Sequence, residues 1–219
     1  MLSVAPLREA TRRFGWRGPL RYPTCFPMVE PFRNYLTAKA AFTNAELEQL
    51  EAAATVKKLK RRDFLLRKGD VCRHMAFVVR GCLRLYRTDE AAEEHILRFA
   101  IENWWITDAE SFRTGLPAQG AIEALEDTQV LLWSKENFER LKTEIPAFNA
   151  LEGQLGSRHL DAQVNRLYAS ISHSAEERYH EFVKAFPDFY QRIPLHMIAS
   201  YLGVSRETLS RIRKQVGFH

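Results

Sequence analysis

The sequence predicts an α+β protein built of an N-terminal jelly roll, a long connecting helix and a C-terminal helix-turn-helix unit. Three observations predict this architecture. Short β-type segments alternate with turns through the first half of the chain, as in antiparallel rolls and sandwiches. Apolar residues then recur at helical spacing from Pro146 to about Ile171. Near the C-terminus, two short amphipathic patterns are separated by Gly203, a residue suited to a tight turn between helices.

The first 27 residues differ in composition from the rest. They hold five arginines, four prolines and one glutamate, and they lack the apolar core of a signal peptide. We expect residues 1–27 to form a disordered basic arm. Two alternatives remain open: the segment is an organelle transit peptide, or the native chain begins at Met28.

The jelly-roll domain is expected over residues 28–145. Phe32 and Leu36 predict a first helix, and Thr43 or Asn44 is suited to cap a second one. Turn-separated β segments follow, which favours a sandwich or barrel and, among these, a jelly roll. Strands are predicted within 56–66 and at 74–79, 83–87, 95–100, 122–125 and 130–133, with an irregular stretch at 107–120.

A basic run lies in the first strand region. Strands of a half-exposed sheet often carry lysines on the solvent side, so we interpret this run as a solvated face rather than a second nucleic-acid site. The run consists of Lys57, Lys58, Lys60, Arg61 and Arg62.

Helices are predicted for the second half of the chain, with Ser134 and Ser174 as N-caps at either side of a long helix at 146–172. This long helix carries two apolar stripes. The first is Leu160, Val164, Leu167 and Ile171, and the second is Phe148, Leu151, Leu155, His159 and Ala162. Two stripes exceed what packing on one domain needs, so we interpret the second as a dimer seam. Docking of that stripe against the jelly roll is the alternative.

A helix-turn-helix unit is predicted within residues 173–219. Small Ala199 permits close helix crossing, Gly203 turns the chain, and Ser205 caps the second helix. With Leu209 and Ile212 turned inward, the outward face of the second helix is basic.

The outward face carries side chains that suit a DNA major groove. Arg206 and Arg211 can each bond guanine O6 and N7 together, and Glu207 can accept from cytosine N4. Hydroxyl and basic side chains around them can bond phosphates and fix the register. These phosphate-binding candidates are Ser205, Thr208, Ser210, Arg213 and Lys214. The alternative is a helical hairpin with a solvated charged face.

Composition and charge support nucleic-acid binding. The net charge is +5, but residues 28–191 hold 22 basic and 25 acidic residues, whereas 192–219 hold five basic and one acidic. A basic terminal module on a nearly neutral body is typical of a nucleic-acid reader.

The three cysteines, Cys25, Cys72 and Cys82, are too scattered for a disulfide framework or metal cluster. Such sparse cysteines fit a reducing cytoplasm, and no apolar run is long enough for a membrane span, so no membrane partner is expected.

With a jelly roll, a long connecting helix and a C-terminal helix-turn-helix unit, the chain resembles the Crp-Fnr family of transcription regulators. The likeness covers about residues 28–219 and is most specific over 205–212, which reads SRETLSRI. It implies that Arg206, Glu207 and Arg211 read a guanine-rich half-site of the TGTGA type. It also implies a homodimer on a palindromic operator, its reading helices about 34 Å apart.

The ligand site departs from the pattern of that family. At the positions of the Gly-Glu pair and the phosphate-binding arginine, the chain has Thr107-Asp108 and Ala118, and Gln163-Val164 replaces the Thr-Ser pair that contacts adenine. Loss of a charge-assisted phosphate partner costs roughly a thousandfold or more in affinity. We therefore expect no control by cyclic AMP. The candidate effector pocket consists of Trp104, Trp105, Asp108, Arg113 and Gln163.

Other sensing and catalytic chemistries find little support in the sequence. Cys25 alone cannot ligate an iron–sulfur cluster, and His74 and His95 are isolated histidines rather than a haem or cupin-type set, so we expect no cofactor and no metal. No phosphate loop, nucleophile elbow or carboxylate pair points to an enzyme. The alternative function is a small-molecule or cyclic-nucleotide sensing module with DNA binding secondary. The sequence does not identify an effector or distinguish activation from repression. It leaves contact with RNA polymerase open as a possible partner interaction.

Overall fold

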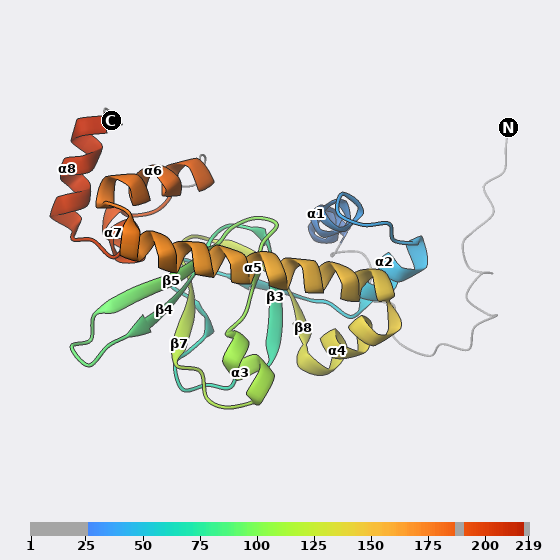
Figure 1. The fold of residues 1–219 in the computed structure, drawn as a ribbon. Helices are drawn as coiled ribbons and strands as arrows, with labels where there is room; N and C mark the ends of the chain where they lie inside the picture. Colours follow the sequence, from blue (N-terminus) through green and yellow to red (C-terminus); the bar gives the residue numbers. More distant parts are fainter. Residues whose placement is uncertain (1–25, 187–190, 217–219) are drawn as a thin grey trace, which may run out of the picture.

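The computed structural model describes residues 26–186 and 191–216, and the predicted arm therefore lies almost wholly outside the described residues. A β-roll occupies the middle of the molecule, with helices at both ends and one long helix running across it (Figure 1). The helices are α1 (Phe26–Thr37), α2 (Asn44–Ala52), α3 (Ala109–Thr114), α4 (Lys135–Glu144), α5 (Pro146–Ser172), α6 (Ala175–Ala185), α7 (Leu195–Leu202) and α8 (Arg206–Val216). The strands are β1 (Thr55–Leu59), β2 (Phe64–Leu66), β3 (His74–Arg80), β4 (Leu83–Thr88), β5 (Glu94–Ala100), β6 (Trp105–Ile106), β7 (Gly120–Ala124) and β8 (Thr128–Ser134).

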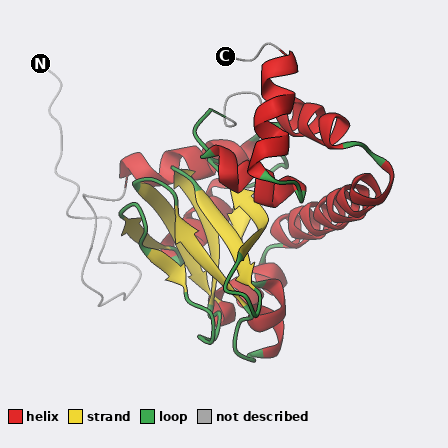
Figure 2. Cartoon of the chain, turned by 90° about the vertical axis from the view of Figure 1, so that its left-hand side faces the viewer, coloured by secondary structure: helices red, strands yellow, loops and turns green. Residues whose placement is uncertain are grey.

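The roll consists of two antiparallel four-stranded sheets. Their strand orders are β1-β8-β3-β6 and β2-β7-β4-β5, so neighbouring strands are mostly distant in sequence. Figure 2 shows the strands as one compact group with helices around them. The predicted α+β class with an antiparallel roll is confirmed.

The first core fills the roll and its covering helices. Trp133 on β8 is fully buried, and its indole N–H donates to the carbonyl oxygen of Leu50 at 2.9 Å, which ties α2 to the sheet. The ring of Phe32 on α1 lies 5.0 Å from that of Phe77 on β3 and 4.9 Å from that of Trp133. Thr43 forms a capping box with Glu46 at the start of α2, which confirms the predicted cap.

One prediction about the roll is wrong. The stretch expected to be irregular contains the helix α3, capped by Asp108, whose carboxylate accepts from the Ser111 amide at 3.0 Å. A left-handed Gly115, with φ of 75°, ends the helix. A six-residue helix offers too few turns for an apolar stripe, so its periodicity was invisible in the sequence.

The basic run at β1 is consistent with a solvated face. Lys58, Arg61 and Arg62 are exposed, and the ammonium of Lys60 lies 2.7 Å from the carboxylate of Asp127. This run therefore lies at the surface, with one of its members paired within the chain.

The long helix α5 crosses the roll from α4 at one end to α6, α7 and α8 at the other (Figure 1). Phe148 and Leu151 are buried in the first core, and Leu155 packs against it. The prediction that this stripe forms a dimer seam is therefore wrong for its first three residues, which the roll covers, whereas His159 and Ala162 of the same stripe are exposed. The opposite stripe is exposed: Leu160, Val164, Leu167 and Ile171 are 64%, 57%, 63% and 79% exposed.

A second core joins the C-terminal helices to the roll. Tyr179, Phe182 and Ile198 of the helices pack in one cluster with Ile96 and Phe99 of β5. None of the described helices combines the length and apolar character needed to cross a bilayer.

Candidate nucleic-acid interface and effector cavity

The turn between α7 and α8 is built on Gly203. Its φ is +65°, a left-handed conformation that glycine adopts without strain. The Val204 amide donates to the carbonyl oxygen of Ala199 at 3.0 Å, and the Gly203 amide donates to that of Ser200 at 3.2 Å. These bonds satisfy carbonyls at the end of α7, so the chain reverses within a few residues.

Helix α8 starts at a serine cap. The Ser205 hydroxyl oxygen accepts from the Thr208 amide at 3.1 Å. The same hydroxyl donates to the Thr208 hydroxyl oxygen at 3.0 Å. Ala199, Leu209 and Ile212 are all buried, as the sequence predicts. The inner face of α8 is thus fixed on α6 and α7, and its outer face is set by the helical period.

The outer face of α8 gathers the predicted reading residues. Arg206, Glu207 and Arg211 are exposed and line one shallow surface depression together with Ser210, Lys214 and Gln215. Among the described residues, no acidic side chain forms a salt bridge with the two arginines. Gln215 was not singled out from the sequence. Arg213 and Thr208 are half-buried at the edges of this face.

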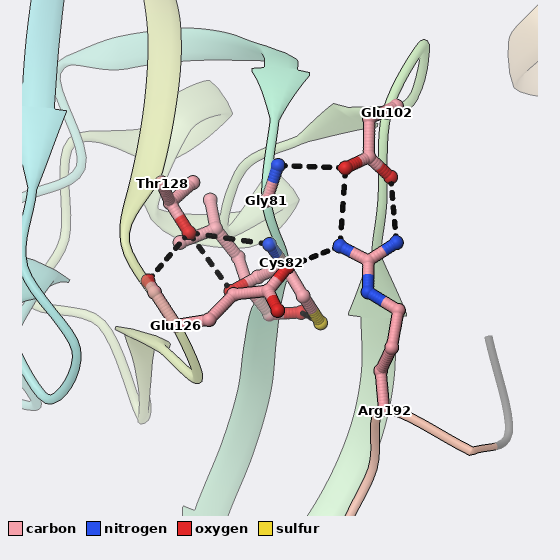
Figure 3. A network of polar contacts seen from close by, with 7 residues as sticks. Gly81, Cys82, Glu102, Glu126, Thr128 and Arg192 are labelled. Carbon is pink, nitrogen blue, oxygen red and sulfur yellow. Dashed lines mark hydrogen bonds and ion pairs between the residues drawn. The ribbon is translucent and has the colours of Figure 1, made fainter.

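The segment before α7 is anchored to the roll by an ionic network (Figure 3). The guanidinium of Arg192 donates to both carboxylate oxygens of Glu102, at 3.0 and 3.1 Å, and also to the carboxylate of Glu126. The Gly81 amide donates to Glu102 at 2.8 Å. Burial alone would raise the pKa of Glu102, but the hydrogen bonds from Arg192 and Gly81 outweigh it and hold the pKa below its usual value.

A second anchor comes from α5. Arg166 donates to the carbonyl oxygens of Leu97 (2.5 Å) and Ile96 (3.2 Å) on β5 and of Tyr201 (2.7 Å) on α7. Three elements therefore meet at one guanidinium. Burial lowers the pKa of Arg166.

A cavity of about 640 Å³ lies between the roll and α5. Trp104, Trp105 and Gln163 line it, which agrees with their place in the predicted effector pocket. Asp108 and Arg113 are not among its lining residues: Asp108 caps α3, and the Arg113 side chain is exposed. Lining side chains that the sequence did not point to include Tyr35, Lys39, Arg98 and Arg158.

Ala118, where the resemblance led us to look for an arginine, is held in its loop by main-chain hydrogen bonds. Ala118 is 2% exposed, and its amide and carbonyl bond Asp70 and Gly69, each at 2.9 Å. No cation therefore projects from this position toward the cavity.

The two histidines weighed as metal ligands lie at the surface. His95 is exposed, and its Nε2 lies 2.8 Å from the Asp89 carboxylate in the β4–β5 turn. His74 is exposed on β3, whereas Cys72 and Cys82 are buried. Burial raises the pKa of the Cys82 thiol above its usual range.

Comparison with known proteins identifies the roll. Residues 56–144 match the family model described as cyclic nucleotide-binding domain. A comparison with curated protein sequences finds no significant match.

Solved structures match most of the chain. FixK2 from Bradyrhizobium japonicum superimposes with a TM-score of 0.65 at 18% identity, covering 75% of this chain and 84% of FixK2. The c-di-GMP responsive global regulator CLP of Xanthomonas campestris gives 0.64 at 15% identity, covering 80% and 92%. A CooA mutant from Carboxydothermus hydrogenoformans gives 0.62 at 17% identity, covering 83% and 84%.

These matches define the class as a cyclic nucleotide-binding-type β-roll followed by a C-terminal helical unit. More particularly, the chain has the fold of FixK2, CLP and CooA, so the arrangement of roll, long helix and C-terminal helices that the resemblance implied is confirmed at the level of the fold.

Proposed function

We propose that the protein is a sequence-specific regulator of transcription that binds double-stranded DNA with α8 in the major groove. The observation that carries this proposal is the joint exposure of Arg206, Glu207 and Arg211 on one face of a capped, well-anchored helix. The two guanidinium forks can each hold a guanine edge, and the carboxylate between them can accept from cytosine.

Phosphate contacts are expected around this reading face. Lys214 and Arg213 near the end of α8 supply charge, while the hydroxyls of Ser205, Thr208 and Ser210 can bond phosphate oxygens. The Ser205 hydroxyl donates its hydrogen to the Thr208 hydroxyl, and the Thr208 hydroxyl can in turn donate its own hydrogen to a phosphate oxygen.

The protein is proposed to act as a homodimer on a palindromic operator. The exposed stripe Leu160, Val164, Leu167 and Ile171 follows the spacing of a two-helix seam, and Tyr168 beside it is 63% exposed. Isolated apolar side chains are ordinary at a surface, but a continuous row along one helix favours association. A second copy packed there would pair the two α8 helices for successive major grooves, about 34 Å apart.

Cyclic AMP is not proposed as the effector. The matched domain is of the cyclic nucleotide-binding type, but the resemblance to the Crp-Fnr family implies that Ala118 stands where that family has its phosphate-binding arginine, and Gln163 lines the cavity from α5. Without a cation at that position, a desolvated cyclic phosphate would lack its strongest partner.

Selection of bound sequences from random double-stranded DNA tests the proposal, since it reports sequence preference, half-site spacing and hence the dimer. Replacement of Arg206 and Arg211 by alanine should cost roughly 1 to 3 kcal/mol of discrimination at each guanine. Arg61→Ala is the matched control, because Arg61 is an exposed arginine on the roll. If the double variant binds the selected sequence as tightly as the parent protein, α8 does not read the DNA.

A further inference from the structure

The cavity beneath α5 has apolar and aromatic walls but an excess of positive charge. Indole rings of Trp104 and Trp105 form part of its lining, together with aliphatic side chains from the roll and α5. Lys39, Arg98 and Arg158 reach it, against the single carboxylate of Glu152. A volume of about 640 Å³ lies within the range of roughly 300 to 1,000 Å³ common for small-molecule sites.

Arg98 is the most deeply placed of these cations. It projects from β5, and its guanidinium donates to the carbonyl oxygen of Trp105 at 2.7 Å, across the open edge between β5 and β6. In the described part of the chain, no carboxylate forms a salt bridge with it. Burial lowers the pKa of Arg98 to about 10, so the group is still a cation at neutral pH.

The histidine beside Arg98 does not change this imbalance. Burial, and after it the charge of Arg98, lowers the pKa of His159 on α5. This imidazole is therefore uncharged at neutral pH and does not alter the charge of the cavity. A guanidinium that is shielded from water and has no carboxylate partner can stabilise a bound anion strongly.

We propose that this cavity binds a small organic anion with an aromatic or apolar body, whose carboxylate-like or sulfonate-like group pairs with Arg98 while the body packs on Trp104 and Trp105. The proposal deepens the regulator function proposed above by naming the chemical class of its effector. It differs from cyclic-nucleotide binding in its anchor, since Arg98 belongs to β5 rather than to the loop that ends at Ala118.

The position of Arg98 links the cavity to the DNA-binding unit. Leu97 and Arg98 line the cavity, and the carbonyl oxygens of Ile96 and Leu97 accept from Arg166, which also holds Tyr201 of α7. A ligand that moves β5 at Arg98 therefore acts on the same strand residues that anchor the C-terminal helices.

A matched pair of dyes tests the proposal on the DNA-free protein. The probes are 1-anilinonaphthalene-8-sulfonate and the neutral N-phenyl-1-naphthylamine, which has the same ring system without the sulfonate. Binding is followed by energy transfer from tryptophan, because Trp104 and Trp105 line the cavity. We expect one sulfonate dye per chain. Arg98→Gln should weaken it about tenfold or more while the affinity for the neutral dye changes less than about twofold.

Two further variants separate the charge of Arg98 from its structural bond to β6. Arg98→Lys keeps the cation and should retain most of the sulfonate affinity, whereas Arg73→Gln, at an exposed arginine outside the cavity, should change neither dye. The proposal is overturned if Arg98→Gln leaves sulfonate binding unchanged, or if it weakens both dyes equally. Because no DNA is present, a failure here leaves the DNA-binding proposal untouched, and the reverse also holds.

Discussion

The guanidinium carbon of Arg166 lies 3.9 Å from the centroid of the Tyr201 ring, while the same guanidinium donates to the Tyr201 carbonyl oxygen at 2.7 Å. A cation over an aromatic face and a charge-assisted hydrogen bond thus act on one residue of α7. Since Arg166 also donates to two carbonyl oxygens of β5, the placement of the C-terminal helices on the roll depends strongly on this side chain.

Arg166→Met should lower the free energy of unfolding by about 2 to 3 kcal/mol, because three partly buried carbonyl oxygens lose a charged donor. Urea denaturation followed by circular dichroism measures the change. Arg158→Met on the same helix is the control, since that side chain is exposed and should change stability by less than about 0.5 kcal/mol. Equal effects of the two substitutions would show that Arg166 does not anchor α7.

Substitution of glycine by alanine should have opposite signs at two positions. Gly203 has a φ of +65°, so Gly203→Ala should destabilise the protein by about 1 kcal/mol, through backbone strain rather than a clash. Gly153 lies inside α5 with nothing near its would-be Cβ, so Gly153→Ala should stabilise by roughly 0.5 to 1 kcal/mol. Thermal unfolding of both variants checks the pair, and a stabilised Gly203→Ala protein would contradict the left-handed turn.

Acid should weaken the contact between Glu102 and Arg192. The folded-state pKa of Glu102 lies below its usual value of 4.5, so its contribution is complete above that pH and is lost as pH falls through the lowered folded pKa. Glu102→Gln should therefore be less stable than the parent at neutral pH, and the difference should shrink below about pH 4.5. Unfolding free energies across this range, with exposed Glu90→Gln as the control, provide the measurement. A difference that persists unchanged at the lowest pH would contradict the ion pair.

The sequence predicted those features that depend on local bonds. Caps such as Ser134, Ser174 and Ser205 bond to amides three residues away, so their signals lie within one short segment. The roles of Arg98 and Arg166 could not be found in this way, because both donate to main-chain carbonyl oxygens of other elements of the fold. Every residue has a main-chain carbonyl oxygen, so the amino-acid sequence does not indicate which of them accepts such a bond.

The two stripes of α5 show the same limit. Helical periodicity revealed two apolar faces, but it could not say which of them the roll covers. The bulky Phe148 lies where α5 begins, beside α4 and the first core, and this tertiary position decides that its stripe is internal. The exposed row that includes Leu167 is the one left for a partner.

Leu167→Asp is therefore expected to dissociate the proposed dimer. Leu167 is 63% exposed within one chain, and a two-fold seam would bury both copies, so the substitution removes roughly 1.5 to 3 kcal/mol of apolar burial from each copy and places a charge there. Asn165→Asp adds the same charge to an exposed residue of α5 beside the stripe and should leave the dimer intact. Sedimentation velocity at micromolar concentration distinguishes the species. A parent protein that sediments as a monomer, or a Leu167→Asp variant that stays dimeric, would rule out this seam.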